Sequence, residues 1–393
     1  MQKYEKKPYL CISNTLKEAA GPYSSAKRDG FMKSLRSILC GIALGWIAAS
    51  CGTGGSAGIC DSISQQEMAA VYETVKTPYK YGLVVAPEDE QHMTDSPTVF
   101  RHEGRWYMTY IVFDGQGYET RLAASDDLLH WETLGNIMSF SEQGWDCSQR
   151  AGYAALVDID WGGGYGLEAY KGCYWMTYLG GSKPGYESRP LSIGVATTDD
   201  PTQPSEWKGL DHPVLSPADT DAQWFERETQ FKSAVFRDKE KHFGCDFVMF
   251  YNAFGVNDTN GLGAERIGIA LSDDMVHWRR YKGNPVVAHE EEGTISGDAH
   301  IQRIGDLYVM FYFRAFTPSR PYKAYNTFAC SRDLVHWYDW QGADLVYPTE
   351  SYDARYAHKS YLINWQGVTY HFYCAVDNEG HRGIAVATSQ PMH

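Results

Sequence analysis

The sequence has little of what several protein classes require. It holds 35 Lys and Arg against 49 Asp and Glu, a formal net charge of −14, and no segment gathers basic residues into a stripe. Nucleic-acid binding needs clustered cations that face phosphates, so we expect no nucleic-acid partner. The cysteines form no CxxC pair and no His/Cys cluster with zinc spacing, which argues against a zinc site.

The one apolar stretch near the N-terminus, at 38–48, is too short to span a bilayer permanently. Basic residues precede it and small residues lead from it to Cys51, the layout of a bacterial lipoprotein signal. We expect a signal peptide at 32–50, a lipid on Cys51, and anchoring in the cell envelope, at the periplasmic or outer-membrane surface. A plain cleaved signal or a short anchor is the alternative. Residues 1–31 are interpreted as a non-native upstream extension.

Aromatic residues and glycine are abundant, with 28 Tyr, 12 Trp and 38 Gly. They recur in five copies of one unit, in which an apolar strand, a short turn and an aromatic strand follow one another. The copies lie at 98–110, 155–178, 234–251, 301–312 and 361–373. Turns such as His102-Glu103-Gly104 supply the residues of a tight hairpin. The repeat predicts an all-β fold, a five-bladed β-propeller with a central active-site pocket.

A third strand follows in each copy and leads to a Ser-Asp-Asp or Ser-Arg-Asp turn and a Trp in the clearest copies. We expect these Trp residues to pack between blades; they are Trp131, Trp207, Trp278 and Trp337. The fifth copy ends before its outer strand, so we expect residues 79–85 to close the ring. Residues 51–77 are interpreted as a tether with a short helix, and 78–393 as the catalytic domain.

Ionisable residues precede the first strand of every copy, where a propeller would place them around the channel mouth. Hydrolysis of a glycosidic bond needs a proton donor and a second carboxylate. We assign Asp95 as general base and Asp298 as the group that orients the sugar or raises the pKa of the acid. The acid is His358 or Glu228, with His358 favoured because its offset matches that of Asp95. We expect Asp95→Asn to abolish turnover and to leave folding intact.

The candidate substrate-binding residues come from the same segments and from the blade connections: Arg150, Lys232, His300, Arg314, Lys359 and Trp145. An alternative interpretation of the charged positions is an internal ring of salt bridges, in which the same pairs would also tune pKa values. We expect no required cofactor. A divalent cation in the central channel is compatible with the fold, although no ligand cluster indicates one.

The SDDLLHW and SDDMVHW turns, the aromatic second strands and TDSPTVF resemble the five-bladed propeller glycosidases of glycoside hydrolase families 43 and 117, over residues 78–391. Family 43 implies an Asp base in the first blade, which Asp95 matches, and inversion at the anomeric carbon. Family 117 implies Asp, Asp and His in chain order, which Asp95, Asp298 and His358 match. The resemblance implies an exo-acting, inverting hydrolase that releases terminal sugars from an oligosaccharide or polysaccharide.

Two other functions stay open on the sequence. A phosphorylase similar to family 130 would need a cationic phosphate pocket, for which Arg150, Arg314 and Lys359 are candidates. A non-catalytic surface lipoprotein would bind glycans through Trp residues in the blade connections, such as Trp145 and Trp161. The expected partners are therefore a glycan and, through the lipid anchor, a membrane.

Overall fold

The computed structural model describes residues 62–321 and 323–392. The signal peptide, Cys51 and the upstream extension predicted from the sequence lie outside these residues. The described part belongs to one compact unit, Ile63–His393, which begins before residue 78, where the sequence placed the start of the domain. No helix in the described residues is both long and apolar enough to cross a membrane.

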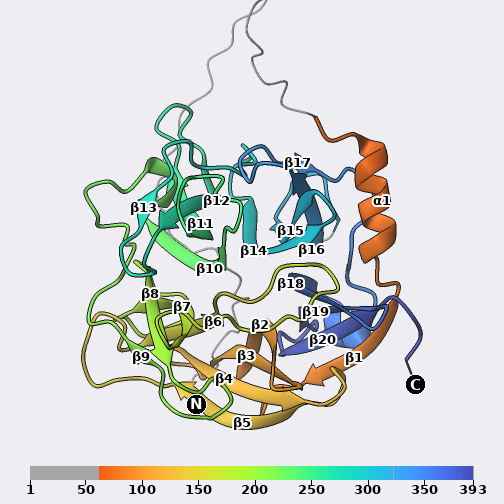
Figure 1. The fold of residues 1–393 in the computed structure, drawn as a ribbon, viewed down its shortest axis with the longest axis horizontal. Helices are drawn as coiled ribbons and strands as arrows, with labels where there is room; N and C mark the ends of the chain where they lie inside the picture. Colours follow the sequence, from red (N-terminus) through yellow and green to blue (C-terminus); the bar gives the residue numbers. More distant parts are fainter. Residues whose placement is uncertain (1–61, 322, 393) are drawn as a thin grey trace, which may run out of the picture. The chain divides into compact units, whose positions relative to one another are not determined.

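The described strands form a β-propeller, and their pairings divide them into consecutive antiparallel sheets, here called blades, arranged around a common centre (Figure 1). The first blade contains β2 (Met93–His102), β3 (Arg105–Phe113), β4 (Tyr118–Ser125) and β5 (Glu132–Met138). The second contains β6 (Gln149–Ala154), β7 (Tyr174–Gly181), β8 (Ser192–Thr198) and β9 (Lys208–Gly209). The third contains β10 (Thr229–Arg237), β11 (Phe247–Val256), β12 (Gly263–Ser272) and β13 (Arg279–Arg280).

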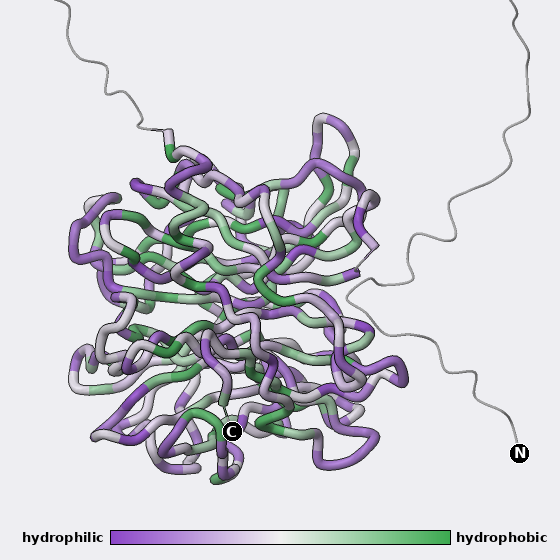
Figure 2. Tube along the Cα trace, turned by 90° about the vertical axis from the view of Figure 1, so that its right-hand side faces the viewer, coloured by the Kyte–Doolittle hydropathy of each residue, from purple (hydrophilic) through white to green (hydrophobic). Residues whose placement is uncertain are grey.

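The last two blades follow the same plan. The fourth contains β14 (Ile295–Ile304), β15 (Leu307–Ala315), β16 (Ala324–Ser331) and β17 (Tyr338–Asp339). The fifth contains β18 (Tyr356–Trp365), β19 (Val368–Val376), β20 (Arg382–Thr388) and β1 (Tyr79–Val85). The short 3-10 helices are η2 (Trp224–Glu226) and η3 (Ser351–Asp353). Hydrophobic segments gather in the interior and hydrophilic ones at the loops (Figure 2).

The ring is closed as the sequence predicts. β1 pairs antiparallel with β20 in a register that sets Tyr79 opposite Thr388, so residues that precede the first blade supply the outer strand of the last one. The first and last blades also meet at a parallel bridge between Met93 and Arg382. This closure pairs strand edges that would otherwise be exposed.

The Ser-Asp-Asp turn has one geometry in three blades, which the first blade illustrates. Asp127 Oδ1 accepts hydrogen bonds from the backbone N–H groups of Leu129 and His130 at 2.9 and 2.8 Å. Asp127 Oδ2 lies 2.7 Å from Nδ1 of the His130 ring, within hydrogen-bond distance. Burial acts to raise the pKa of Asp127, but these hydrogen bonds outweigh it and lower the pKa to about 2. Trp131 then packs against Phe372 of the fifth blade at 5.9 Å between ring centres, so the predicted packing between blades is confirmed.

The other three Trp residues behave in the same way. Trp337 of the fourth blade contacts Phe250 of the third at 5.7 Å between ring centres. Trp207 is 1% exposed and shares a core cluster with residues of the first two blades. Trp278 packs against a cluster drawn from the second and third blades. The aromatic excess in the sequence therefore builds the seams of the ring.

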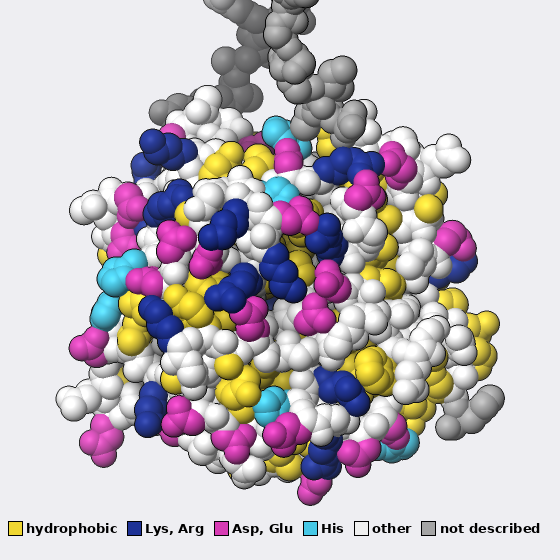
Figure 3. All heavy atoms as spheres, viewed as in Figure 1, with side chains coloured by type: hydrophobic (Ala, Val, Ile, Leu, Met, Phe, Trp, Pro, Cys, Tyr) yellow, Lys and Arg dark blue, Asp and Glu magenta, His cyan; other side chains and the backbone are white. Residues whose placement is uncertain are grey.

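The connection between β6 and β7 crosses the middle of the ring (Figure 1). Arg101 of the first blade pairs with Gly166 in this connection, and Arg303 of the fourth blade pairs with Asp160. The Tyr165 hydroxyl accepts a hydrogen bond from the Asn364 backbone of the fifth blade at 2.8 Å. The connection thus ties three blades together at the end of the channel where β2 and β3 turn. On the face drawn in Figure 3, basic and acidic side chains lie intermixed.

The short helix predicted before the first blade is present as α1 (Gln65–Val75). Ser64 is the N-cap of α1. It forms a capping box with Glu67 and so satisfies backbone donors of the first turn. Met68, Val71 and Val75 are buried against residues of β15 and β16, so α1 covers the outside of the fourth blade.

Candidate active site

The innermost strands of four blades carry the same irregularity. In β2, β10, β14 and β18 one extra residue interrupts the pairing, a β-bulge. In three of these strands a residue with left-handed backbone lies at the bulge: Ser96, Asp298 and Lys359 adopt φ values of 46°, 56° and 62°. Such left-handed backbone at a bulge redirects a side chain. The three residues thus occupy one repeated position inside the strands.

This register corrects two parts of the sequence interpretation. The charged residues lie within the first strands, not before them, because β2 begins at Met93 and β18 at Tyr356. Asp298 does not share the offset of Asp95 and His358. The residue that pairs like Asp95 and His358 is Gly297, and Asp298 is equivalent to Lys359.

Asp95 is the centre of a buried ion-pair cluster. Its side chain is 1% exposed, and its Oδ2 accepts from Lys359 Nζ at 2.9 Å and from Arg382 Nη1 at 3.0 Å. Burial acts to raise the pKa of Asp95, but the positive charges of Lys359 and Arg382 hold it well below its usual range. Asp95 is therefore ionised and engaged by two cations. The salt-bridge interpretation of the sequence expects other cations, namely Arg150, Arg227, Arg314 and Lys232. Of these, Lys232 alone pairs with one of the predicted catalytic residues, Asp298.

Asp298 pairs more loosely with Lys232. Asp298 Oδ2 lies 3.8 Å from Lys232 Nζ and accepts a hydrogen bond from Ser96 Oγ at 3.3 Å. Lys232 Nζ has no hydrogen-bond partner among the described residues and lies 5.2 Å from the centre of the Tyr153 ring. Burial lowers the pKa of Lys232.

Glu265 is a buried carboxyl near this cluster that is not among the residues predicted from the sequence. Glu265 is 3% exposed, and its Oε2 accepts from Asn252 Nδ2 at 3.3 Å. Its Oε1 has no hydrogen-bond partner among the residues described. Burial raises the pKa of Glu265 to about 8; the negative charge of Glu187 adds to this, and Arg189 opposes it. At neutral pH Glu265 is therefore mostly protonated and can give up a proton.

Glu187 lies in the connection between β7 and β8, which two tyrosines attach to neighbouring blades. Tyr118 donates its hydroxyl hydrogen bond to Glu187 Oε1 at 3.3 Å. Tyr186 accepts from Arg382 Nη1 at 2.9 Å, and its ring packs against that of Tyr118 at 5.8 Å. Arg382 thus binds both Asp95 and this connection, which links Glu187 to the buried ion pairs.

Both predicted histidines are buried in the interior of the ring. His358 Nδ1 lies 3.2 Å from the Cys374 carbonyl oxygen, and burial lowers its pKa to about 3. His300 packs on Tyr361 at 3.9 Å between ring centres, and burial lowers its pKa to about 3 as well. A cavity of about 40 Å³ beside His300 and Lys232 lies between the inner strands. Both imidazoles are neutral at pH 7.

Two predicted binding residues of the second blade have their contacts elsewhere. Arg150 pairs with Asp146 at 3.2 Å and with Glu206 at 2.6 Å, partners that lie outside the Asp95 cluster. The Trp145 ring packs on Tyr178 at 5.4 Å between ring centres, and its Nε1 donates to the Leu210 carbonyl at 3.3 Å. Packing therefore explains the position of Trp145, and ion pairs within the second blade explain that of Arg150.

Glu228 and Arg314 also lie apart from the ion pairs around Asp95. Glu228 has a side chain that is 51% exposed and lies 3.9 Å from Arg189. Arg314 Nη2 lies 3.7 Å from Glu291 Oε2. Glu228 is therefore a half-exposed carboxyl outside the buried cluster, unlike Glu265.

The described residues contain no group of three or more His, Cys, Asp or Glu that could hold a metal ion. The divalent cation considered from the sequence stays a prediction. Cys147, Cys173, Cys245, Cys330 and Cys374 are free thiols.

The residues missed from the sequence share a position. Tyr118, Glu265 and Arg382 each bridge to the first strand of a neighbouring blade, opposite Gln149, Ile295 and Met93 respectively. They therefore lie in the first three residues of the third strands, at the same end of the ring as Asp95. A comparison of third strands extended to these residues would have found them; Glu265-Arg266 is a charged pair in an otherwise apolar strand.

Comparison with known proteins gives the class. No protein-family model matches the chain, and no curated protein matches it. The solved RGII complex of BT0996 is 57% identical, with 84% of this chain and 97% of that chain covered and a TM-score of 0.83. A structure described as a glycoside hydrolase gives the same values. The protein therefore belongs to the glycoside hydrolases, and it is an enzyme of the glycosidase type.

More distant structures share the fold alone. A thermostable family-43 glycoside hydrolase is 14% identical, with 78% of this chain and 96% of that chain covered and a TM-score of 0.54. Zg3597, a family 117 glycoside hydrolase of Zobellia galactanivorans, is 14% identical, with 80% of this chain and 91% of that chain covered and a TM-score of 0.56. The resemblance in fold to these two families, drawn from the sequence, is thereby confirmed.

Proposed function

We propose that this enzyme hydrolyses a glycosidic bond in RGII, with Glu265 as the general acid and Glu187 as the second carboxylate. The observation that carries the proposal is the buried Glu265 carboxyl, whose pKa is raised to about 8 with Glu187 nearby in the same electrostatic environment. A glycosidase needs two carboxyl groups with different protonation states.

In this proposal Glu265 gives its proton to the leaving oxygen as the bond to the anomeric carbon breaks. Its Oε1, which lacks a hydrogen-bond partner among the described residues, is the atom suited to carry the proton. Asn252 holds the other oxygen at 3.3 Å and so orients the carboxyl group. His358 is less suited to this step because an imidazole with a pKa of about 3 is not protonated at neutral pH.

Glu187 then accepts a proton from the water that attacks the anomeric carbon, and the sugar is released with inverted configuration. The Tyr118 hydroxyl, which donates to Glu187 Oε1 at 3.3 Å, supports this role because it orients the carboxyl group. Asp95 is the alternative base, but two cations on one oxygen make it a weak proton acceptor. We assign Asp95 instead to holding Lys359 and Arg382.

The relative that is 57% identical, whose structure is a complex with RGII, supports RGII as the substrate. Removal of terminal sugars is the mode we propose. The connection between β6 and β7, which joins three blades across the channel, supports it, because a glycan could not thread through the ring.

The experiment is digestion of RGII oligosaccharides by wild type, Glu265→Gln and Asp95→Asn, with products separated by chromatography in the presence and absence of phosphate. We expect wild type to release a monosaccharide without phosphate and Glu265→Gln to release almost none. Phosphate-dependent release of a sugar phosphate would identify a phosphorylase instead. Binding of the oligosaccharide with no release would leave the glycan-binding alternative.

Lipid anchoring is the cellular part of the proposal. The small residues before Cys51 support it. Metabolic labelling with a fatty acid should mark the wild-type protein in the membrane fraction, whereas Cys51→Ala should be unlabelled. A labelled Cys51→Ala protein would contradict the anchor.

A further inference from the structure

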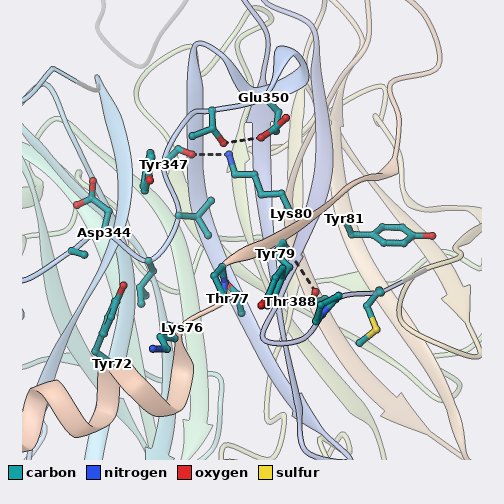
Figure 4. Close-up of a pocket in the computed structure, with 17 residues that line it drawn as sticks. Tyr72, Lys76, Thr77, Tyr79, Lys80, Tyr81, Asp344, Tyr347, Glu350 and Thr388 are labelled. Carbon is teal, nitrogen blue, oxygen red and sulfur yellow. Dashed lines mark hydrogen bonds between the residues drawn. The ribbon is translucent and has the colours of Figure 1, made fainter.

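A groove of about 690 Å³ lies outside the ring of first strands, between α1, β1 and the segment that follows β17 (Figure 4). Tyr72 comes from α1, Tyr79 and Lys80 come from β1, and Tyr347 comes from the segment after β17. None of the residues of the Asp95 and Glu265 cluster lines this groove. The groove is therefore separate from the candidate active site.

Exposed tyrosine rings concentrate in this groove. Four large hydrophobic side chains of the described residues are exposed, and two of them, Tyr79 at 47% and Tyr347 at 42%, line it. Tyr72 adds a third ring, stacked on Trp340 at 5.3 Å between centres. A tyrosine presents a flat apolar face and a polar hydroxyl, which is the pair of surfaces that a sugar ring also presents.

The backbone carbonyls of the two exposed tyrosines accept hydrogen bonds from neighbouring side chains. Lys80 Nζ donates to the Tyr347 carbonyl at 2.7 Å and also pairs with the buried Asp353. Tyr79 accepts a hydrogen bond from Thr388 Oγ1 at 3.3 Å through its carbonyl. The dashed contacts of Figure 4 show how these bonds join β1 to the neighbouring segment. A groove formed on paired backbone loses little entropy when a ligand binds.

Three of the four charged side chains that line the groove are paired within the protein. Lys76 pairs with Glu73, Lys80 with Asp353, and Asp344 with Arg320. Glu350, which also lines the groove, accepts a hydrogen bond from Thr349 Oγ1 at 3.1 Å. A charged ligand would have to compete with these ion pairs, whereas a neutral polyhydroxyl ligand would meet rings, hydroxyls and backbone carbonyls.

We propose that this groove, the Tyr79–Tyr347 groove, is a second glycan-binding site that takes neutral sugar residues of the polysaccharide on which the enzyme acts. The inference rests on the proposed function, because a non-catalytic site is useful where the substrate is a large glycan. Two sites on one polymer raise the effective concentration of the second binding event. The groove would thus keep the catalytic ring near its substrate without touching the bond that is cleaved.

The test is affinity electrophoresis of the full-length protein in gels that contain RGII, at low and high salt. The variants are Tyr79→Ala with Tyr347→Ala, and a matched control, Leu83→Ala with Val256→Ala, that removes the other two exposed apolar side chains. We expect the tyrosine variant to bind RGII about tenfold more weakly, and the control to bind as wild type does. Binding should persist at high salt, because the ligand is neutral.

Hydrolysis of a short RGII oligosaccharide, measured in parallel, separates the two proposals. We expect the tyrosine variant to hydrolyse it at the wild-type rate and to lose efficiency only on the polymer. If RGII in the gel retards wild type and the tyrosine variant equally, or if high salt abolishes the retardation, the proposal that the groove binds neutral sugars is wrong. Failure of wild type to hydrolyse the oligosaccharide, with retardation that depends on the tyrosines, would overturn the proposed function alone.

Tyr79 lies in the strand that closes the ring, so folding is checked separately. Tyr347→Ala alone changes only the segment after β17 and should retain about the wild-type unfolding midpoint while it weakens RGII binding. If Tyr347→Ala keeps the wild-type unfolding midpoint and binds RGII as tightly as wild type, the result contradicts the proposed glycan site. Equal binding by the double variant would contradict it in the same way.

Discussion

Arg382 Nη1 lies 3.0 Å from Asp95 Oδ2, although the two residues are 287 positions apart in the sequence. The bond joins the last blade to the first, at the seam where Met93 of β2 also bridges to Arg382. The same guanidinium holds the Tyr186 hydroxyl at 2.9 Å. One buried arginine therefore contacts both the seam between the first and last blades and the Glu187 connection.

The first prediction concerns Asp95→Asn. The asparagine keeps the size of the side chain but leaves Lys359 and Arg382 buried without a countercharge, so we expect a loss of about 3 kcal/mol in the free energy of unfolding at pH 7. The folded-state pKa of Asp95 is lowered, so its stabilisation is present above the unfolded pKa of about 3.9 and is lost as pH falls below it. Denaturant unfolding of both proteins at pH 7 and pH 3 measures this.

This expectation differs from the one drawn from the sequence, where Asp95→Asn leaves folding intact, because the two cations are visible only in the fold. Equal stability of the two proteins at pH 7 would contradict the buried ion pairs as a source of stability. The control is Asp126→Asn, which removes an exposed partner of Arg105 and should change stability little.

The second prediction concerns the rate. Glu265→Gln cannot donate a proton to the leaving oxygen, so we expect kcat to fall by about 10²–10⁴. The loss should be smaller for substrates with an activated leaving group, which need less protonation. In wild type, kcat/KM should decline above about pH 8 as Glu265 loses its proton, and that decline should be absent from the residual rate of the variant. Rates over pH 5–9 measure both.

Glu228→Gln is the matched control, since Glu228 was the carboxyl considered as acid from the sequence. Its side chain is 51% exposed, and we expect the variant to keep the pH profile of wild type. A loss of the alkaline decline in Glu228→Gln, with Glu265→Gln active, would reverse the assignment.

The third prediction concerns stability as a function of pH. The folded-state pKa of Glu265 is raised to about 8, above the value of about 4.3 in the unfolded chain. Its protonated form therefore contributes fully to the free energy of unfolding below about pH 4.3, and this contribution is lost as pH rises to 8. We expect wild type to lose on the order of 4 kcal/mol of unfolding free energy over this range from this group. Glu265→Gln should lose less over the same range. Parallel curves for the two proteins would show that Glu265 is not buried as a neutral acid.

The fold could be predicted because its determinants repeat. Trp131 and its three counterparts recur at regular positions in the sequence. The fifth copy of the repeat ends before its outer strand, and the segment that begins at Tyr79 can supply that strand. The sequence alone therefore indicates a closed ring. Asp95 and Lys359 were found because they lie on first strands, where the repeats align well. Their bond at 2.9 Å was not predictable, because it joins blades from distant parts of the sequence.

The missed residues lie where the repeats diverge. Glu265 is the third residue of β12 and Arg382 the first residue of β20, and each lies before the recurring apolar segment on which the copies align. Glu187 belongs to the connection between β7 and β8, outside the strands on which the copies align, and Tyr186 next to it contacts Arg382. A pKa raised by burial is likewise a property of the packed ring, not of local sequence.

The last prediction concerns Tyr118, which positions Glu187. Tyr118→Phe keeps the ring packed against Tyr186 and removes only the hydroxyl that donates to Glu187 Oε1 at 3.3 Å. Loss of a hydrogen bond to a charged group should lower kcat about tenfold and leave KM and the unfolding midpoint near their wild-type values. Tyr110→Phe, which removes a hydroxyl bonded to Thr133 at 2.8 Å, is the control and should keep the wild-type kcat. If Tyr118→Phe and Tyr110→Phe have the same kcat, the Tyr118 hydroxyl does not position a catalytic carboxylate, and the case for Glu187 over Asp95 as the base loses its structural support.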